Sequence, residues 1–231
     1  ISGITGGNET NEAITLADES NGKYVYTHYS RAGYGKLGFR GDFGPVQFVE
    51  VRQAIAYCMD RATFAKDFTG GFGGVVDGPY YTGSWMYKAA VADGMMLDAY
   101  ATSADSAIAV LEQGGWVYNA DGSEWTEGNI RHKKVTAVEA GDYAHNVTLE
   151  DGTILMPLII EWSSSENNSV SELLNVMLAQ SEATKATGMV INQNVMTFTE
   201  LLNYYYRDGS QGEKYLVPTY GMFNLATNFT P

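Results

Sequence analysis

The chain has a single cysteine, Cys58, which excludes an internal disulfide. Positive charge is scarce as well: 14 lysines and arginines stand against 27 acidic residues, for a net charge of −13. Nucleic-acid backbones and anionic membrane surfaces attract concentrated positive charge, so we expect neither as a partner. No apolar run reaches the roughly 18 residues that a membrane-spanning helix needs.

Motifs for metal, nucleotide and nucleophilic chemistry are missing too. The three histidines, His28, His132 and His145, lack the spacing of a zinc site. The glycines of TGGFGG do not match a dinucleotide-binding fingerprint, and no serine stands in a G-x-S-x-G motif. We therefore expect no metal site, no cofactor and no catalytic constellation.

The strongest local signal is an amphipathic pattern that begins at Glu50. Its apolar residues recur at intervals of three and four, on one face of a helix: Val51, Ala54, Ile55, Cys58, Ala62, Ala65 and Phe68. The pattern predicts one helix that packs on a core and ends at Gly70-Gly71, with Cys58 as a small buried hydrophobe.

Before this helix, the sequence predicts a short helix, capped by Asn8 or Thr10, that runs through Ala17. It also predicts strands at 23–30 and 37–40 and a turn at Gly44-Pro45. After the helix, the glycine-rich run from Thr69 to Lys88 predicts a loop. Ser103 or Thr102 is expected to cap a helix that ends at Gly114-Gly115, and the string NADGS to turn a short hairpin.

The last third of the chain alternates between strands and helices. Two strands are predicted to meet at Asp151-Gly152, and Leu158–Trp162 is the best candidate for a buried strand. Predicted capping boxes, Ser169 with Glu172 and Thr197 with Glu200, start two helices. Strands at 189–196 and 220–225 complete the pattern, which favours an α/β layer beside an irregular, hairpin-rich middle third.

The order of these pieces resembles a known family. The run EVRQAIAYCMDR is similar to a V-R-x-A-I-x-x-x-x-D-R helix of the extracellular solute-binding proteins of family 5, the peptide, dipeptide and nickel receptors of bacterial ABC importers. Its matching residues are Val51, Arg52, Ala54, Ile55, Asp60 and Arg61. The family's L-x-x-x-G-W and D-G pieces have counterparts at Leu111, Gly115-Trp116 and Asp121-Gly122, and its strand-helix-strand unit at 158–196.

This resemblance implies a fold and a role. The fold is a single α/β lobe of the periplasmic-binding-protein type (type II, cluster C-like), with a mixed sheet, flanking helices and a hairpin-rich insertion. Residues 1–231 would form one domain, most of the second lobe of a two-lobe receptor. The start ISGITGG has neither an initiator Met nor a signal-peptide pattern, so we expect a processed or cut piece of a larger protein. That protein would be extracytoplasmic, as a cell-surface lipoprotein or in the periplasm.

The resemblance also implies partners and ligand contacts. The protein would be a monomer that takes up a peptide or another small solute and delivers it to ABC permease subunits. Residues expected to face the cleft are Tyr81, Trp85, Glu161, Trp162, Asn224, Thr227 and Asn228. When Pro231 is aligned with a family proline, Thr227 replaces the aspartate that meets a peptide amino group and Asn224 replaces a tryptophan. A neutral threonine lacks the charge for that pairing, which puts recognition of a peptide amino terminus in doubt.

Alternatives remain open at this point. The cargo can instead be an oligosaccharide or a metal chelate, and the same lobe can serve as a sensor or adhesion protein. The aromatic loop that carries Tyr81 and Trp85 can simply cover the sheet. A small hydrolase is the competing class, in which Glu161 would pair with Asp151 or Glu166 as two carboxylates.

Overall fold

A four-stranded mixed sheet in the order β1-β7-β5-β6 is the centre of the fold. The computed structural model describes residues 15–25 and 32–229. The strands are β1 (Gly33–Phe39), β5 (Ile159–Ser165), β6 (Val190–Met196) and β7 (Met222–Asn228). β5 is parallel to both β6 and β7. β1 runs antiparallel to β7, because Arg40 N donates to Gly221 O and, at the opposite end, Phe229 N donates to Ala32 O.

The hairpin-rich middle forms a second sheet, in which all strands are antiparallel. Its order is β2-β4-β3, with β2 (His132–Val135), β3 (Val147–Thr148) and β4 (Ile154–Pro157). The predicted turn at Asp151-Gly152 is confirmed, with Gly152 at a φ of 84° and the Asp151 carboxylate accepting from Thr153 N. Pro157 ends β4, where a missing N–H costs no further ladder bond.

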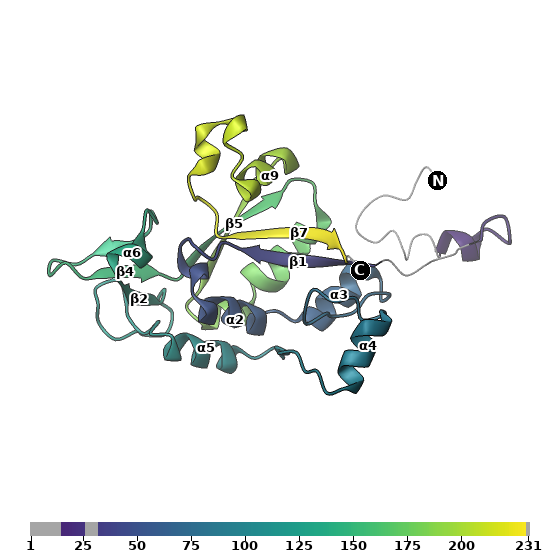
Figure 1. Cartoon of the computed structure of the whole chain (residues 1–231), viewed down its shortest axis with the longest axis horizontal. Coiled ribbons are helices and arrows are strands. Elements are labelled where there is room, and N and C mark those ends of the chain that lie inside the picture. Colours follow the sequence, from purple (N-terminus) through teal and green to yellow (C-terminus); the bar gives the residue numbers. More distant parts are fainter. Residues whose placement is uncertain (1–14, 26–31, 230–231) are drawn as a thin grey trace. The chain divides into compact units, whose positions relative to one another are not determined.

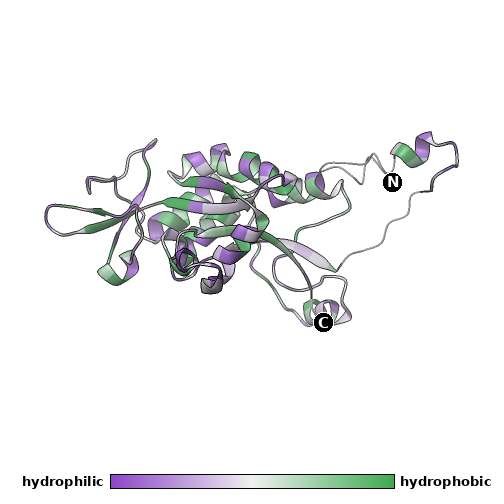
Figure 2. Ribbon diagram, turned by 90° about the horizontal axis from the view of Figure 1, so that it is seen from above, coloured by the Kyte–Doolittle hydropathy of each residue, from purple (hydrophilic) through white to green (hydrophobic). Residues whose placement is uncertain are grey.

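Helices cover both faces of the four-stranded sheet, with α9 on one side and α2 and α5 on the other (Figure 1). The helices are α2 (Val49–Cys58), α3 (Arg61–Thr69), α4 (Trp85–Ala92), α5 (Ala104–Gln113), α6 (Ala137–Ala140), α7 (Ser169–Leu174), α8 (Glu182–Ala186) and α9 (Phe198–Tyr206). Short turns are η1 (Pro45–Gln47), η3 (Gly209–Gln211) and η4 (Glu213–Leu216), and α7 continues as a π-helical segment, η2 (Asn175–Ala179). Green and purple residues alternate along the helical ribbons, as amphipathic helices require (Figure 2).

The chain divides into two compact units. Unit 1 comprises the described residues of the segments Ile1–Lys36, Arg61–Ala99 and Ala226–Pro231, and unit 2 comprises Leu37–Asp60 and Tyr100–Leu225. Unit 2 contains β5, β6, the antiparallel sheet and most of the helices, whereas unit 1 contains α3 and α4. None of the helices in the described ranges is both long and apolar enough to cross a bilayer.

The prediction of one helix from Glu50 to Phe68 was wrong. α2 ends at Cys58, Met59 is extended, and α3 starts at Arg61. Two residues from a distant part of unit 2 take up the freed carbonyls: Ser103 N donates to Tyr57 O at 2.9 Å and Thr102 Oγ1 to Met59 O at 3.2 Å. α2 buries Val51, Ala54, Ile55 and Cys58 as predicted, but α3 has no buried residue.

Burial raises the pKa of the Cys58 thiol to about 11.

Helix starts were predicted more accurately. Ser103 caps α5 and Thr197 caps α9, each accepting a backbone N–H three residues on. The cap of α7 is Asn168 rather than the predicted Ser169, because the Asn168 side chain already accepts from Ser171 N. The predicted loop at 69–88 also runs too far, since Ser84 caps α4 and Trp85 begins it.

Several predictions fall on residues 1–14 and 26–31, outside the described ranges. Asn8, Thr10 and His28 lie there, as does most of the predicted strand at 23–30. The described part of that segment, residues 23–25, is not a strand, while residues 15–19 are helical in agreement with the predicted short helix.

A buried arginine joins three parts of unit 2. The Arg131 side chain is 1% exposed, and its guanidinium donates to Thr187 O (2.9 Å), Trp116 O (2.8 Å) and Glu112 Oε1 (3.1 Å). It also lies over the Trp125 ring, 3.6 Å from the centroid. One side chain therefore ties together the end of α5, the hairpin after it and the turn before β6.

Candidate ligand-binding residues

The carboxyl ends of parallel strands are where α/β sheets usually bind ligands. β5 ends at Ser165 and β6 at Met196, and α7 and α9 begin shortly after them. β5 is three residues longer than the predicted 158–162 segment at its carboxyl end. Glu161 and Trp162 therefore lie inside the strand, and not at its end as expected.

Trp162 and Asn224, two of the expected cleft residues, lie together in unit 2. The Trp162 indole Nε1 donates to Asn224 Oδ1 at 3.0 Å, and Asn224 Nδ2 donates to Ser171 Oγ on α7 at 3.0 Å. Trp162 is 1% exposed, so its side chain packs in the core on one face of the sheet and does not face solvent. This network positions β7 and α7 against β5.

Glu161 lies on the opposite face of β5, in a separate polar cluster. The strand register pairs Glu161 with Asn192 and places Asn194 on the same face. Asn192 Nδ2 donates to Glu161 Oε1 at 2.9 Å and Asn194 Nδ2 to Oε2 at 2.7 Å, while His145 Nε2 lies 3.0 Å from Oε1. The carboxylate is therefore held by neutral amides and one imidazole, and 18% of its side chain stays exposed.

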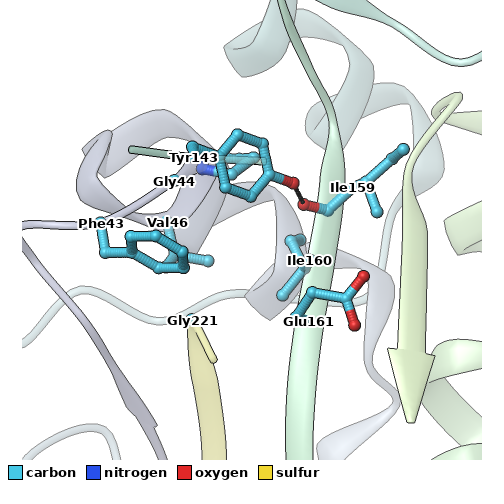
Figure 3. A pocket seen from close by; sticks show the side chains of 9 residues that line it. Phe43, Gly44, Val46, Tyr143, Ile159, Ile160, Glu161 and Gly221 are labelled. Atoms are coloured by element: carbon cyan, nitrogen blue, oxygen red, sulfur yellow. Dashed lines mark hydrogen bonds between the residues drawn. The ribbon is translucent and has the colours of Figure 1, made fainter. Parts of the chain in front are cut away.

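A shallow hollow, with about 160 Å³ of free space that includes open solvent, adjoins Glu161 (Figure 3). It is lined by Phe43, Gly44, Pro45, Val46, Tyr143, Ile159, Ile160, Glu161 and Gly221. Figure 3 shows Tyr143 across the hollow, its hydroxyl donating to the carbonyl of Ile159. The hollow leaves almost no room for a water-sized molecule, so it cannot enclose a peptide or a sugar by itself.

Two tyrosines next to this cluster keep their hydroxyl protons. Burial raises the pKa of Tyr143 well above its ordinary value, and the charge of Glu161 raises it further. Burial also raises the pKa of Tyr220, with smaller contributions from Tyr204, Glu200 and Glu161. Both groups are therefore hydrogen-bond donors at neutral pH, and neither is a source of negative charge.

The remaining expected contacts belong to unit 1. Tyr81 packs on Phe229, whose ring also stacks on Tyr34, with centroid distances of 5.7 and 4.5 Å. Trp85 is 76% exposed at the start of α4, where an aromatic ring is available to a ligand. Thr227 and Asn228 are the last residues of β7.

The candidate hydrolase carboxylates are engaged separately. The Asp151 carboxylate caps its own turn by accepting from Thr153 N, and Glu161 is held by Asn192 and Asn194. Within the described residues, no group of three or more His, Cys, Asp and Glu side chains is arranged to hold a metal ion.

The partners of Glu161 were not predicted from the sequence. Asn192 and Asn194 stand two positions apart on a predicted strand, a spacing that places both on one face. That spacing was the only local signal, because His145 comes from the loop before β3 and reaches Glu161 across 16 positions.

His132 provides a test of the buried end of β2. Burial lowers its pKa, so the folded protein binds a proton less readily than the unfolded chain does. We expect stability to be highest above pH 6.5 and to fall as the pH decreases through the unfolded pKa of about 6.5. Melting temperatures at pH 8 and pH 5 measure this loss, and His132→Gln should show a smaller loss than the natural chain. An equal loss in both would contradict the assignment.

Comparison with known proteins gives the same fold. No protein-family model matches the sequence, and no curated protein matches it either. Solved structures do match. The NikA protein from Brucella suis in complex with Fe(III)-EDTA covers 96% of the chain at 16% identity, with a TM-score of 0.62. The AppA oligopeptide-binding protein from Bacillus subtilis, in complex with a nonapeptide, covers 96% at 14% identity and a TM-score of 0.62.

The fold is that of a solute-binding-protein lobe. The oligopeptide-binding protein from Thermus thermophilus, complexed with a pentapeptide, agrees over 85% of the chain at 16% identity, with a TM-score of 0.60. The chain corresponds to only 35%, 40% and 28% of the NikA, AppA and Thermus proteins. The α/β lobe with a mixed sheet and flanking helices, expected from the resemblance, is thereby confirmed at the level of the fold.

Proposed function

We propose that the chain is most of the second lobe of a family 5 substrate-binding protein, and that it forms one wall of a cleft for a peptide or peptide-like solute. The observation that carries this proposal is the match of 96% of the chain to 35% of NikA, solved with Fe(III)-EDTA, and to 40% of the oligopeptide-binding protein AppA, solved with a nonapeptide. In this proposal the two compact units belong to that one lobe, and the protein is a non-enzymatic, extracytoplasmic monomer that passes its cargo to ABC permease subunits.

The small hollow in unit 2 encloses almost no space, so in this proposal a second lobe supplies the other wall of the cleft. Residues proposed to contact the solute are Tyr81, Trp85, Glu161, Thr227 and Asn228. Trp162 and Asn224 take a positioning role, because their side chains are bonded to each other behind the sheet.

Cargo class is proposed as peptide on two grounds. Two of the compared proteins were solved with peptides, and the exposed Trp85 ring offers contact area that does not depend on a peptide's sequence. A metal chelate is the second candidate, since NikA from Brucella suis was solved with Fe(III)-EDTA and NikZ from Campylobacter jejuni with Ni(L-His).

Native mass spectrometry of a mixed peptide pool tests the proposal. The pool is offered to this chain alone and to the longer natural protein that contains it. We expect the longer protein to retain peptides and this chain to retain few, because a clamp with one wall leaves the ligand exposed. Retention of nickel or iron chelates in place of peptides would favour a metal chelate, the second candidate, as the cargo. Hydrolysis of the pool would overturn the binding role.

A substitution pair sharpens the test. In the longer protein, Trp85→Ala should lower the affinity for the retained peptides by at least about 10-fold, because truncation removes a large aromatic contact. Phe72→Ala changes another exposed aromatic residue of the same unit and should leave binding within about twofold. Equal effects of the two changes would remove Trp85 from the proposed contacts.

A further inference from the structure

A group of three aromatic rings in unit 1 joins the ends of β1 and β7 to the loop before α4. The Tyr34 ring, on β1, stacks on Phe229 with a centroid distance of 4.5 Å and an interplanar angle of 28°. Phe229 directly follows β7, and its N–H donates to Ala32 O at 3.0 Å. The Tyr81 ring reaches Phe229 from the loop, with a centroid distance of 5.7 Å. Phe229 therefore packs against two rings that come from distant segments of the chain.

Gly83 leaves the space that the end of the Tyr81 ring occupies. A β-carbon at position 83 would lie 2.6 Å from Tyr81 Cζ and 2.7 Å from its hydroxyl oxygen, which is closer than such atoms approach. The φ of Gly83 is not positive, so this position needs glycine for space and not for backbone conformation. Tyr81 is half-buried here, whereas Tyr80 beside it in the sequence is 49% exposed.

The backbone of Tyr81 is bonded to the start of α4. Tyr81 O accepts from Ser84 N at 2.9 Å, and Ser84 Oγ caps α4 by accepting from Tyr87 N at 3.1 Å. Trp85 is the first residue of that helix. The same short segment therefore fixes the Tyr81 ring and the helix start that carries Trp85.

A ring that is already fixed is a stronger ligand contact than a mobile one. When a ligand orders a mobile side chain, the loss of rotamer freedom weakens binding. Packing on Phe229 and over Gly83 restricts the torsions of Tyr81 before any ligand arrives.

We propose that Gly83, Phe229 and Tyr34 are positioning residues, which hold the Tyr81 ring in one place for contact with the solute. This inference rests on the proposed function, in which Tyr81 and Trp85 contact the solute. It deepens that function, because none of the three positioning residues is itself a proposed contact.

Two glycine-to-alanine changes in the longer natural protein test the proposal. Gly83→Ala displaces only the end of a side chain, so the fold is kept and the melting temperature should stay within about 2 °C. The affinity for peptides retained from the mixed pool should fall about 5-fold, because the ring has lost its fixed place. Gly74→Ala is the control. Gly74 lies in the same unit without a positive φ, and its β-carbon would meet nothing within 4 Å, so the affinity should stay within about twofold.

Variants of the other two rings locate the effect. Phe229→Ala removes the ring on which Tyr81 packs and should lower the affinity about 5-fold, while Phe229→Tyr keeps the ring and should stay within about twofold. Tyr34→Ala acts through Phe229 and should lower the affinity less than Phe229→Ala does. A purely structural role would lower the melting temperature and leave the affinity of the folded protein unchanged. If Gly83→Ala does not fold, the Phe229 pair still distinguishes the two roles.

Nuclear Overhauser measurements on this chain examine the ring without any solute. We expect contacts between the Gly83 α protons and the Tyr81 ring, and between the rings of Tyr81 and Phe229. In Phe229→Ala the contact between Tyr81 and Gly83 should weaken, because the ring is no longer held from the other segment.

Two outcomes would overturn this proposal and leave the proposed function standing. In the first, the longer natural protein retains peptides, but Gly83→Ala and Gly74→Ala bind them equally well. In the second, the Tyr81 ring shows no Overhauser contact with Gly83 or Phe229. Failure of the proposed function is a different result, in which the natural protein retains neither peptides nor chelates, and this inference then falls with it. If only chelates are retained, Fe(III)-EDTA replaces the peptide pool in the same comparison.

Discussion

Replacing Arg131 with alanine should lower the free energy of unfolding of unit 2 by about 3–5 kcal/mol. The guanidinium is buried and donates to Thr187 O, Trp116 O and Glu112 Oε1. Its removal leaves two carbonyl groups in the interior without this donor and takes a cation from the face of Trp125. Urea unfolding followed by tryptophan fluorescence measures the change.

Two further variants separate the causes of that loss. Arg131→Lys keeps the charge, but its compact ammonium does not reproduce the planar fork, so we expect at least about 1 kcal/mol of destabilisation. Lys185→Ala removes an exposed cation that pairs with Glu182 and should change stability by less than about 0.5 kcal/mol. If Arg131→Ala lowers the free energy of unfolding no more than Lys185→Ala does, the contacts of the guanidinium do not stabilise unit 2.

Replacing Trp162 with alanine should cost about 3–5 kcal/mol, the usual range for a fully buried tryptophan. The indole is 1% exposed in the middle of β5 and is bonded to Asn224. Trp162→Phe keeps most of the buried apolar area but removes the Nε1 donor. We expect it to cost about 1–2 kcal/mol, because Asn224 Oδ1 then loses its best donor.

Urea unfolding at one pH compares these variants with Phe198→Ala, a change of a 55% exposed aromatic residue in the same unit. The control should stay within about 0.5 kcal/mol. Since Phe198 is not a tryptophan, the fluorescence signal of the control remains that of the natural chain. A tolerated Trp162→Ala would mean that β5 is not the centre of the core.

Local patterns in the sequence were sufficient where hydrogen-bond partners are close in the chain. Thr197 was identified as a cap, and Ser103 as one of two candidates with Thr102, because a helix start needs a side-chain acceptor three residues before a donor. Asn168 was missed in favour of Ser169 because both residue types cap well, and only the position of the first turn distinguishes them.

Patterns failed where distant residues compete for the backbone. Apolar spacing continues from α2 into α3, yet the helix breaks at Met59. Thr102, 43 positions away, supplies the hydrogen bond that the broken turn has lost. Periodicity describes only one helix at a time, so it gives no information about such a partner. The same limit hid the role of Arg131, whose acceptors lie 15 to 56 positions away.

The candidate contacts were sorted by the tertiary structure in the same way. Glu161 and Trp162 are neighbours in sequence, but a strand turns successive side chains to opposite faces, so one meets Asn192 and the other Asn224. Because the two residues are adjacent in the sequence, we predicted that both would face one cleft. The pleat of β5 instead places their side chains on opposite faces of the sheet.

The sequence by itself determined the alternation of strands and helices, the acidic charge and the order of motifs that resembles a solute receptor. These properties depend on residue type and short spacing, so they can be recognised from hydrophobic periodicity and helix-capping residues. The tertiary structure decided which side chains share a face and which polar groups are satisfied in the interior. Those outcomes depend on contacts between residues far apart in the chain, and such contacts form only when the whole sheet is assembled.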